Sequence, residues 1–142
     1  MFDYPYALTS DDNGTVMLTF PDFPEAVTFG DTEDEARLHA VDALETAMQG
    51  RISDRQDIPF ARASTGATVA PSLLAQHKLL VYQAMRARGW RKADLARELS
   101  AHPTQVDRLL SLRHATPIAQ LEQAYRVCGR RVVIETRELA AA

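Results

Sequence analysis

Residues 16–36 read VMLTFPDFPEAVTFGDTEDEA, and this stretch predicts two strands followed by a helix. Val16, Leu18 and Phe20 alternate with other residues, which is the period of a half-buried strand. The prolines that follow interrupt strand hydrogen bonding, and residues 26–29 then have the composition of a further strand. The stretch therefore predicts a small sheet that leads directly into a helix.

The helix is predicted to begin after Thr32, because Glu35 follows three residues later and completes a capping box. Acidic residues around this point also suit the positive end of a helix dipole. Apolar residues recur at helical spacing from Ala36 to Met48, and Gly50 is expected to end the helix. One face of this helix should cover the sheet.

The chain on both sides of this stretch extends the predicted sheet. Upstream, residues 4–8 alternate and a turn at residues 10–14 connects them to residues 16–20, which predicts a β-hairpin. Downstream, residues 67–70 read as a short fourth strand that returns after the helix. The fold class predicted for the first half is α+β, in the order β-β-β-α-β.

The second half is predicted to be helical. One helix opens at Pro71 or Ser72 and ends near Gly89, and two short helices follow, the second over about residues 103–111. The apolar residues of this pair are spaced to form a joint core, and their spacing resembles the helix-turn-helix of phage-repressor-like (Xre) regulators. Ser100 stands where that motif usually has glycine, and because a serine in a left-handed conformation is costly, we expect the turn to be distorted.

The outward side of this helix pair carries the candidate DNA-binding residues. Gln and Arg side chains can make bidentate contacts to base edges, and basic side chains around them can contact phosphate. The alternative is that the same residues form an ordinary solvated helix face. The candidates are Lys92, Thr104, Gln105, Arg108 and Arg113.

A last helix is predicted from Pro117 to Gly129, and residues 132–136 after it are strongly strand-like. A lone strand in a helical module needs a neighbour, because isolated ladders are not stable in water. Val132, Val133 and Ile134 are therefore candidates for dimerisation by pairing with the same strand of a second chain. The competing possibility is that this strand docks on the N-terminal sheet of its own chain.

Charge divides the chain at the same place as the change in pattern. The 142 residues are 46% hydrophobic and 25% charged, which excludes disorder and fibres. Residues 1–70 carry 13 Asp and Glu against 4 Arg, a net charge of −9, whereas residues 71–142 carry a net charge of +6. We therefore expect two modules, 1–70 and 71–142, that face partners of opposite charge. The alternative is that each half is simply an unevenly charged surface.

Several classes of protein are disfavoured by what the sequence lacks. No stretch approaches the roughly 18 consecutive apolar residues of a membrane span, and the N-terminus has no secretory pattern, so a cytoplasmic location is expected. Cys128, the single cysteine, reads as a small buried side chain. The histidines lack i, i+4 pairing and no nucleotide or hydrolase motif occurs, so no metal, cofactor or enzymatic activity is expected.

Taken in order, these residues resemble HicB-type antitoxins. The N-terminal match covers Tyr6-Ala7, Gly14, Phe20-Pro21-Asp22-Phe23-Pro24 and Gly30-Asp31-Thr32 with Glu35-Ala36, and the C-terminal match covers about residues 71–137. The resemblance implies a partial ribonuclease-H-like domain that blocks a small basic mRNA-cleaving toxin, HicA, followed by a helix-turn-helix domain. It also implies repression of the protein's own operon through operator DNA.

Candidate toxin contacts lie in the proline-rich turn. Phe23 and the nearby acids Asp22 and Glu25 could combine an apolar contact with attraction to a basic toxin, although Phe23 could equally be ordinary core. One rival hypothesis is a metal-dependent nuclease that uses carboxylates such as Asp3, Asp22 and Glu45. Another is a stand-alone DNA-binding transcriptional regulator whose first half senses a small molecule.

Overall fold

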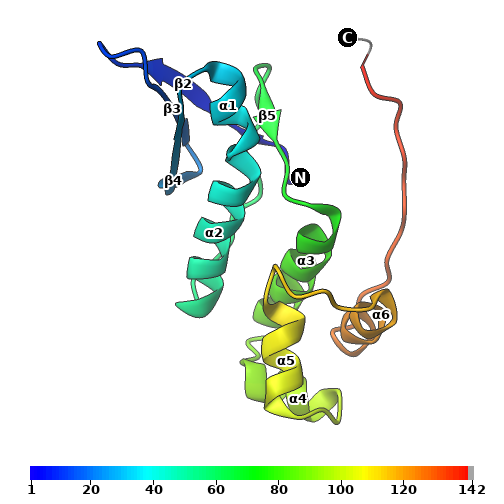
Figure 1. Ribbon diagram of the computed structural model, residues 1–142. Helices are drawn as coiled ribbons and strands as arrows, with labels where there is room; N and C mark the ends of the chain where they lie inside the picture. The colour runs from blue at the N-terminus through cyan, green and yellow to red at the C-terminus, as the bar shows by residue number, and fades with distance from the viewer. Residues whose placement is uncertain (141–142) are drawn as a thin grey trace.

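The computed structural model describes residues 1–140 and shows an α+β fold with a sheeted first half and a helical second half (Figure 1). Strands β2 (Ala7–Ser10), β3 (Val16–Phe20) and β4 (Phe23–Gly30) form an antiparallel sheet in the order β2-β3-β4. Helices α1 (Glu33–Leu38) and α2 (Ala40–Ser53) cover one face of it. The predicted α+β class and the alternation of β3 are confirmed.

The predicted first and fourth strands differ from the structure. The strand predicted over residues 4–8 is divided, and only its part from Ala7 onward joins the main sheet. β1 (Tyr4–Pro5) instead pairs antiparallel with β5 (Thr68–Val69). The expected return of the fourth strand to the main sheet is therefore wrong. The switch has a local cause, because Pro5 has no N–H to donate and the buried Tyr4 side chain turns inward, where its hydroxyl donates to the Pro59 carbonyl at 2.7 Å.

Strand β4 is longer than predicted, because Pro24 does not break it. β4 is an edge strand, where a missing N–H is tolerated, and an irregularity in the β3–β4 register lies at Thr19 and Phe20. The longer strand brings Phe23 into the core.

The helix after the sheet starts as predicted but is divided. Thr32 Oγ1 accepts the Glu35 N–H at 3.1 Å, which confirms the cap. The helix then breaks at His39, whose Nδ1 lies 3.0 Å from the Phe29 carbonyl oxygen, and its second part runs past Gly50 to Ser53. Gly30 is required at the strand–helix junction, since a Cβ there would lie 2.4 Å from the Ala36 nitrogen.

The helical half follows the predicted boundaries closely. It contains α3 (Leu73–Ala87), α4 (Lys92–Glu98), α5 (Pro103–Leu110) and α6 (Ile118–Val127). The side chains that hold these helices together are apolar and buried, among them Leu79, Leu95, Val106, Leu109, Leu121 and Ala124. Cys128 directly follows α6 and is buried, and this burial raises the pKa of its thiol.

The two halves share one continuous cluster of buried side chains. Hydrogen bonds also cross the boundary near residue 70. Glu45 Oε1 accepts the Ser72 N–H at 2.8 Å, and the Tyr82 hydroxyl donates to the Gln56 carbonyl at 2.6 Å. The division into 1–70 and 71–142 stays a prediction, but the halves do not have separate interiors.

The predicted C-terminal strand is not formed in the single chain. Within the described residues, the segment from 130 to 140 has no regular secondary structure and runs away from α6 as an exposed tail (Figure 1). It does not dock on the N-terminal sheet of its own chain. The physical reason is that a strand needs a hydrogen-bonded neighbour, which one chain does not supply here.

Candidate functional site

Helices α4 and α5 form a compact pair joined by a tight turn. Leu95 from α4 and Val106 and Leu109 from α5 are buried, as their spacing predicts. Ser100 in the turn adopts the left-handed conformation that glycine usually takes there, with a φ of 51°. Helix α5 begins at Pro103, and the His102 ring accepts the Thr104 N–H at 3.2 Å as a cap. The first turn of α5 is therefore held firmly.

The outward face of α5 carries the predicted polar residues in exposed positions. Thr104, Gln105 and Arg108 are all exposed. Gln105 Oε1 also accepts the His102 N–H at 3.3 Å, so this amide is partly used in capping. Lys92 on α4 bonds Asp107 at 3.0 Å, which holds the basic group beside the same face. Four of the five predicted DNA-binding residues thus lie on or next to one exposed surface.

Arg113 is engaged elsewhere. Its guanidinium donates to Asp42 Oδ1 at 2.6 Å and to Thr46 Oγ1 at 2.7 Å, both on α2. In the same loop, the Leu112 N–H donates to Gln49 Oε1 at 2.7 Å. The loop after α5 is therefore tied to the first half, and Arg113 is a link between halves in this conformation.

A buried lysine, which the sequence analysis did not single out, fixes the end of α5. Lys78 Nζ donates to the carbonyl oxygens of Arg108, Ser111 and His114 at 2.6–3.0 Å, and it lies 2.8 Å from Thr116 Oγ1. These carbonyls include C-terminal groups that a helix cannot satisfy itself. Burial lowers the pKa of Lys78 to about 8. In the sequence, Lys78 follows Ala75 by three residues, so helical spacing places it on the buried face of α3, and this position is the signal that could have identified it.

The predicted toxin contacts are largely occupied within the chain. Phe23 is completely buried, with its ring centroid 5.1 Å from that of Tyr4, so it belongs to the core and is not available as a surface contact. Asp22 pairs with Arg62. Glu25 is exposed but pairs with Arg51, which holds the pKa of its carboxyl below the usual range. Of these residues, only Glu25 borders open surface.

The sheet face opposite α1 and α2 is a feature that the sequence analysis missed. The pairing register places on it six residues, none of them charged: Ala7, Thr9, Met17, Thr19, Val27 and Phe29. Phe29 is 53% exposed and Val27 is 41% exposed. We call these six residues the outer sheet face. Asp11, Asp12 and Asp31 follow the strand ends at one border, and Glu25 precedes Val27 at another.

The carboxylates considered for a nuclease do not converge. Asp3 is exposed, Asp22 is paired with Arg62, and Glu45 is buried against the start of α3. Among residues 1–140, no group of three or more His, Cys, Asp or Glu side chains is arranged to hold a metal ion. Nor does that part of the chain contain a helix with the length and apolar character needed to cross a membrane.

Comparison with known proteins gives a consistent result. Residues 3–79 match the family model described as HicB_like antitoxin of bacterial toxin-antitoxin system. The chain is 35% identical to Antitoxin HicB 2 of Photorhabdus laumondii, with 89% of this chain and 91% of the relative covered. It is 34% identical to Antitoxin HicB of Pseudomonas fluorescens, with 94% and 93% covered. It is 33% identical to Antitoxin HicB of Escherichia coli K12, with 89% and 94% covered.

These relatives are named as antitoxins, which agrees with the non-enzymatic role expected from the sequence. The family match includes the sheet, both helices that cover it and the start of α3. The similarity to complete relatives continues through most of the helical half. This chain belongs to the HicB-like antitoxin family.

Proposed function

We propose that the protein is a cytoplasmic antitoxin that binds and inhibits a small HicA-type mRNA-cleaving toxin and represses its own operon by binding operator DNA as a dimer. Family membership supports the antitoxin role. The proposals on toxin and operator binding rest on two exposed surfaces. One is the outer sheet face, which lies in the acidic half, and the other is the exposed face of α5, which lies in the basic half.

The observation that carries the toxin proposal is the outer sheet face. Antiparallel sheets that face water normally carry polar side chains on that side, whereas here Phe29 and Val27 stand exposed. Acidic residues border the face, and the half that contains it has a net charge of −9. A basic protein with a small apolar patch is the partner that this arrangement suits, since apolar burial supplies affinity and the border charges steer the encounter.

The α5 face supports the operator proposal. A short helix with Thr104, Gln105 and Arg108 exposed is a suitable element for reading base edges in the major groove. Lys92 lies beside it as a phosphate contact. A dimer would place two such helices roughly 34 Å apart, which is one turn of DNA.

The toxin proposal is tested by Phe29→Asp, with binding measured by isothermal titration calorimetry against the purified toxin. We expect affinity to fall by about thirtyfold or more, as for a central apolar contact. Leu38→Asp is the matched control, because Leu38 is 80% exposed on α1, on the other side of the sheet. It should bind as the wild type does.

The possible outcomes test the antitoxin role separately from the choice of the outer sheet face as the toxin-binding surface. A wild-type protein that binds no toxin would remove the antitoxin mechanism and favour the stand-alone regulator. Wild-type affinity in Phe29→Asp would preserve the mechanism and move the toxin contact to another face.

A further inference from the structure

A cavity lies where the chain segment after α2 meets the end of α3 and the start of α4, so both halves of the chain contribute to it. Its volume is about 630 Å³. Among the residues of 1–140 that line it, four are basic and none is acidic. The basic residues are Arg55, Arg86, Arg91 and Lys92. A hollow lined by charge of one sign concentrates ions of the other sign, so this cavity suits an anion.

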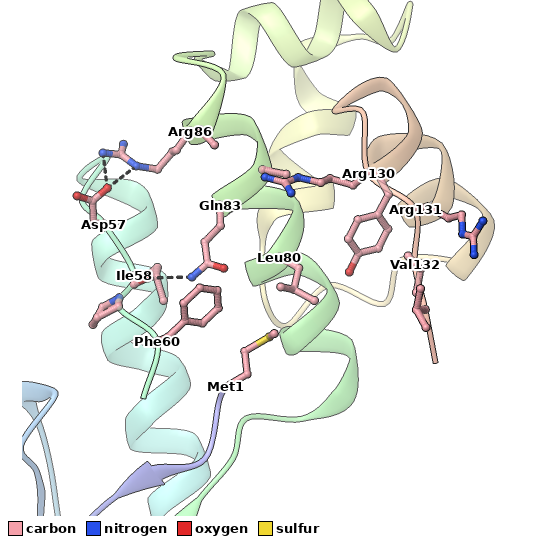
Figure 2. A pocket seen from close by; sticks show the side chains of 15 residues that line it. Met1, Asp57, Ile58, Phe60, Leu80, Gln83, Arg86, Arg130, Arg131 and Val132 are labelled. Atoms are coloured by element: carbon pink, nitrogen blue, oxygen red, sulfur yellow. Dashed lines mark hydrogen bonds and ion pairs between the residues drawn. The ribbon is translucent and has the colours of Figure 1, made fainter. Parts of the chain in front are cut away.

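The four cations differ in how far the protein itself neutralises them. Arg86 pairs with Asp57 at 2.8 Å, and Figure 2 shows this pair. Neither Arg55 nor Arg91 forms an ion pair with any side chain of residues 1–140. Both residues are exposed. Their guanidinium groups therefore keep their positive charge for a ligand, and guanidinium geometry suits phosphate oxygens.

Arg55 is held in a backbone conformation that arginine rarely adopts. It follows the end of α2 with a φ of 58°, and the N–H of Gln56 donates to the Arg51 carbonyl at 2.8 Å. This bond is typical of a helix that ends in a left-handed residue, and glycine is the usual residue there because it has no Cβ. An arginine at this position strains the backbone, and strain of this kind is characteristic of functional positions.

The cavity lies beside the helix pair that is proposed to bind operator DNA. Lys92 lines the cavity, and its Nζ also bonds Asp107 on α5 at 3.0 Å, so the length of one lysine side chain separates the cavity from α5. Arg86 Nη1 donates to the Arg55 carbonyl at 2.7 Å and so fixes Arg55 beside α3. Duplex DNA carries one negative charge per roughly 1.7 Å of its axis. DNA bound to α5 would therefore bring further phosphates toward this cavity.

We propose that this cavity binds a backbone phosphate of duplex DNA, with Arg55 from the first half and Arg91 from the second half as its cations. The inference rests on the proposed binding of operator DNA by α5, and it extends that contact into the first half of the chain. A phosphodiester carries no base identity, so the site adds affinity without adding sequence preference.

The test compares Arg55→Gly with the wild type as full-length proteins, using fluorescence anisotropy on promoter DNA over a series of salt concentrations. Loss of one phosphate contact should lower the affinity about fivefold at about 0.15 M salt. It should also reduce the slope of log affinity against log salt by about 0.9. The loss should be equal for an unrelated duplex. Because glycine suits the positive φ, urea denaturation should show that the variant is at least as stable as the wild type.

Two further variants separate charge from structure. Arg55→Lys keeps the positive charge and should keep the salt slope of the wild type. Arg126→Ala removes the same charge from α6, away from the cavity, and should leave both affinity and slope unchanged.

A shallower salt slope in Arg55→Gly that Arg55→Lys restores supports the proposal. An unchanged slope in Arg55→Gly, or an equal loss in Arg126→Ala, would overturn it. Inorganic phosphate is titrated into the DNA-free protein and followed by the fluorescence of Trp90, which lines the cavity. Saturable binding of phosphate, with DNA affinity unchanged in Arg55→Gly, would assign the cavity to a free anion instead.

The same data separate this site from the operator proposal. A wild type that binds no duplex would overturn the operator proposal and the phosphate site together. Promoter binding that depends on Arg108 but not on Arg55 would preserve the operator proposal and overturn the phosphate site alone.

Discussion

Lys78 places a positive charge in the interior, and its surroundings explain why it is kept. Three carbonyl oxygens and a hydroxyl surround its ammonium group, so the charge is compensated by hydrogen bonds rather than by an acid. The lysine thus joins α3 to the end of α5 and to the loop that follows it. A neutral apolar side chain in this position would remove the lysine donor, and the Arg108 and Ser111 carbonyls would keep only the N–H groups of Ser111 and His114, each at 3.2 Å.

We predict that Lys78→Met lowers the free energy of unfolding by about 3 kcal/mol, since buried acceptors lose their donor. Urea denaturation followed by circular dichroism measures the change. Lys92→Met is the control, because Lys92 is exposed and its pair with Asp107 is a surface pair. It should change stability by no more than about 0.5 kcal/mol. Equal effects from both variants would contradict the structural role of Lys78.

Substitution of Ser100 is predicted to raise the free energy of unfolding, whereas substitution of Lys78 lowers it. The φ of 51° at Ser100 is costly for a residue with a Cβ. Ser100→Gly should therefore stabilise the protein by about 0.5–1 kcal/mol, measured in the same way. Ser111→Gly is the comparison, because Ser111 has a φ of −79° and gains nothing from glycine. An unchanged or lower stability for Ser100→Gly would show that the serine side chain offsets the strain.

At the scale of single elements, what the sequence could predict depends on how local the cause is. Helices α3 to α6 begin and end close to the predicted residues, since caps, glycines and apolar periodicity act within a few residues. The pairing of β1 with β5 could not be predicted, because it joins residues far apart in the chain. The break at His39 likewise depends on a contact with Phe29, on a neighbouring strand.

The candidate sites follow the same rule. The exposure of Thr104 and Arg108 was predictable from the position of α5's apolar stripe. The burial of Phe23 was not, because residues between two prolines have no periodicity that shows which way they point. The outer sheet face could not be recognised without the strand register, which sets which residues share a face.

Helix α5 carries the prediction on DNA. Arg108→Ala should lower affinity for the protein's own promoter DNA by about tenfold, as for loss of one bidentate base contact. Fluorescence anisotropy at fixed salt measures this, with Arg126→Ala on α6 as the control. If Arg108→Ala weakens binding equally for the promoter and for an unrelated duplex, Arg108 contacts phosphate and does not read sequence.

At the scale of the whole molecule, opposite charge does not mean separate folding. The acidic and basic halves share a core, and Arg113 and Gln49 tie the loop after α5 to α2. The charge division was visible in the sequence, but these links were not, since they join residues on opposite sides of the boundary near residue 70. Any partner that displaces α2 would also act on the end of α5.

We predict a single cooperative unfolding transition. Trp90, the single tryptophan, reports on the second half, whereas far-UV circular dichroism reports on both halves. The two urea curves should coincide, and Gln49→Ala should shift both together to lower urea. A circular dichroism change that precedes any change in Trp90 fluorescence would show that the first half unfolds independently.

The position of Cys128 offers a means to follow such motions. The thiol is buried after α6 and its pKa is raised, so reagents that need an accessible thiolate should spare the native protein. Its modification rate would therefore record how often α6 detaches from α3. Because the chain has no other cysteine, the modification rate of this thiol reports the frequency of local opening at α6 alone, and it can be measured with or without a bound partner.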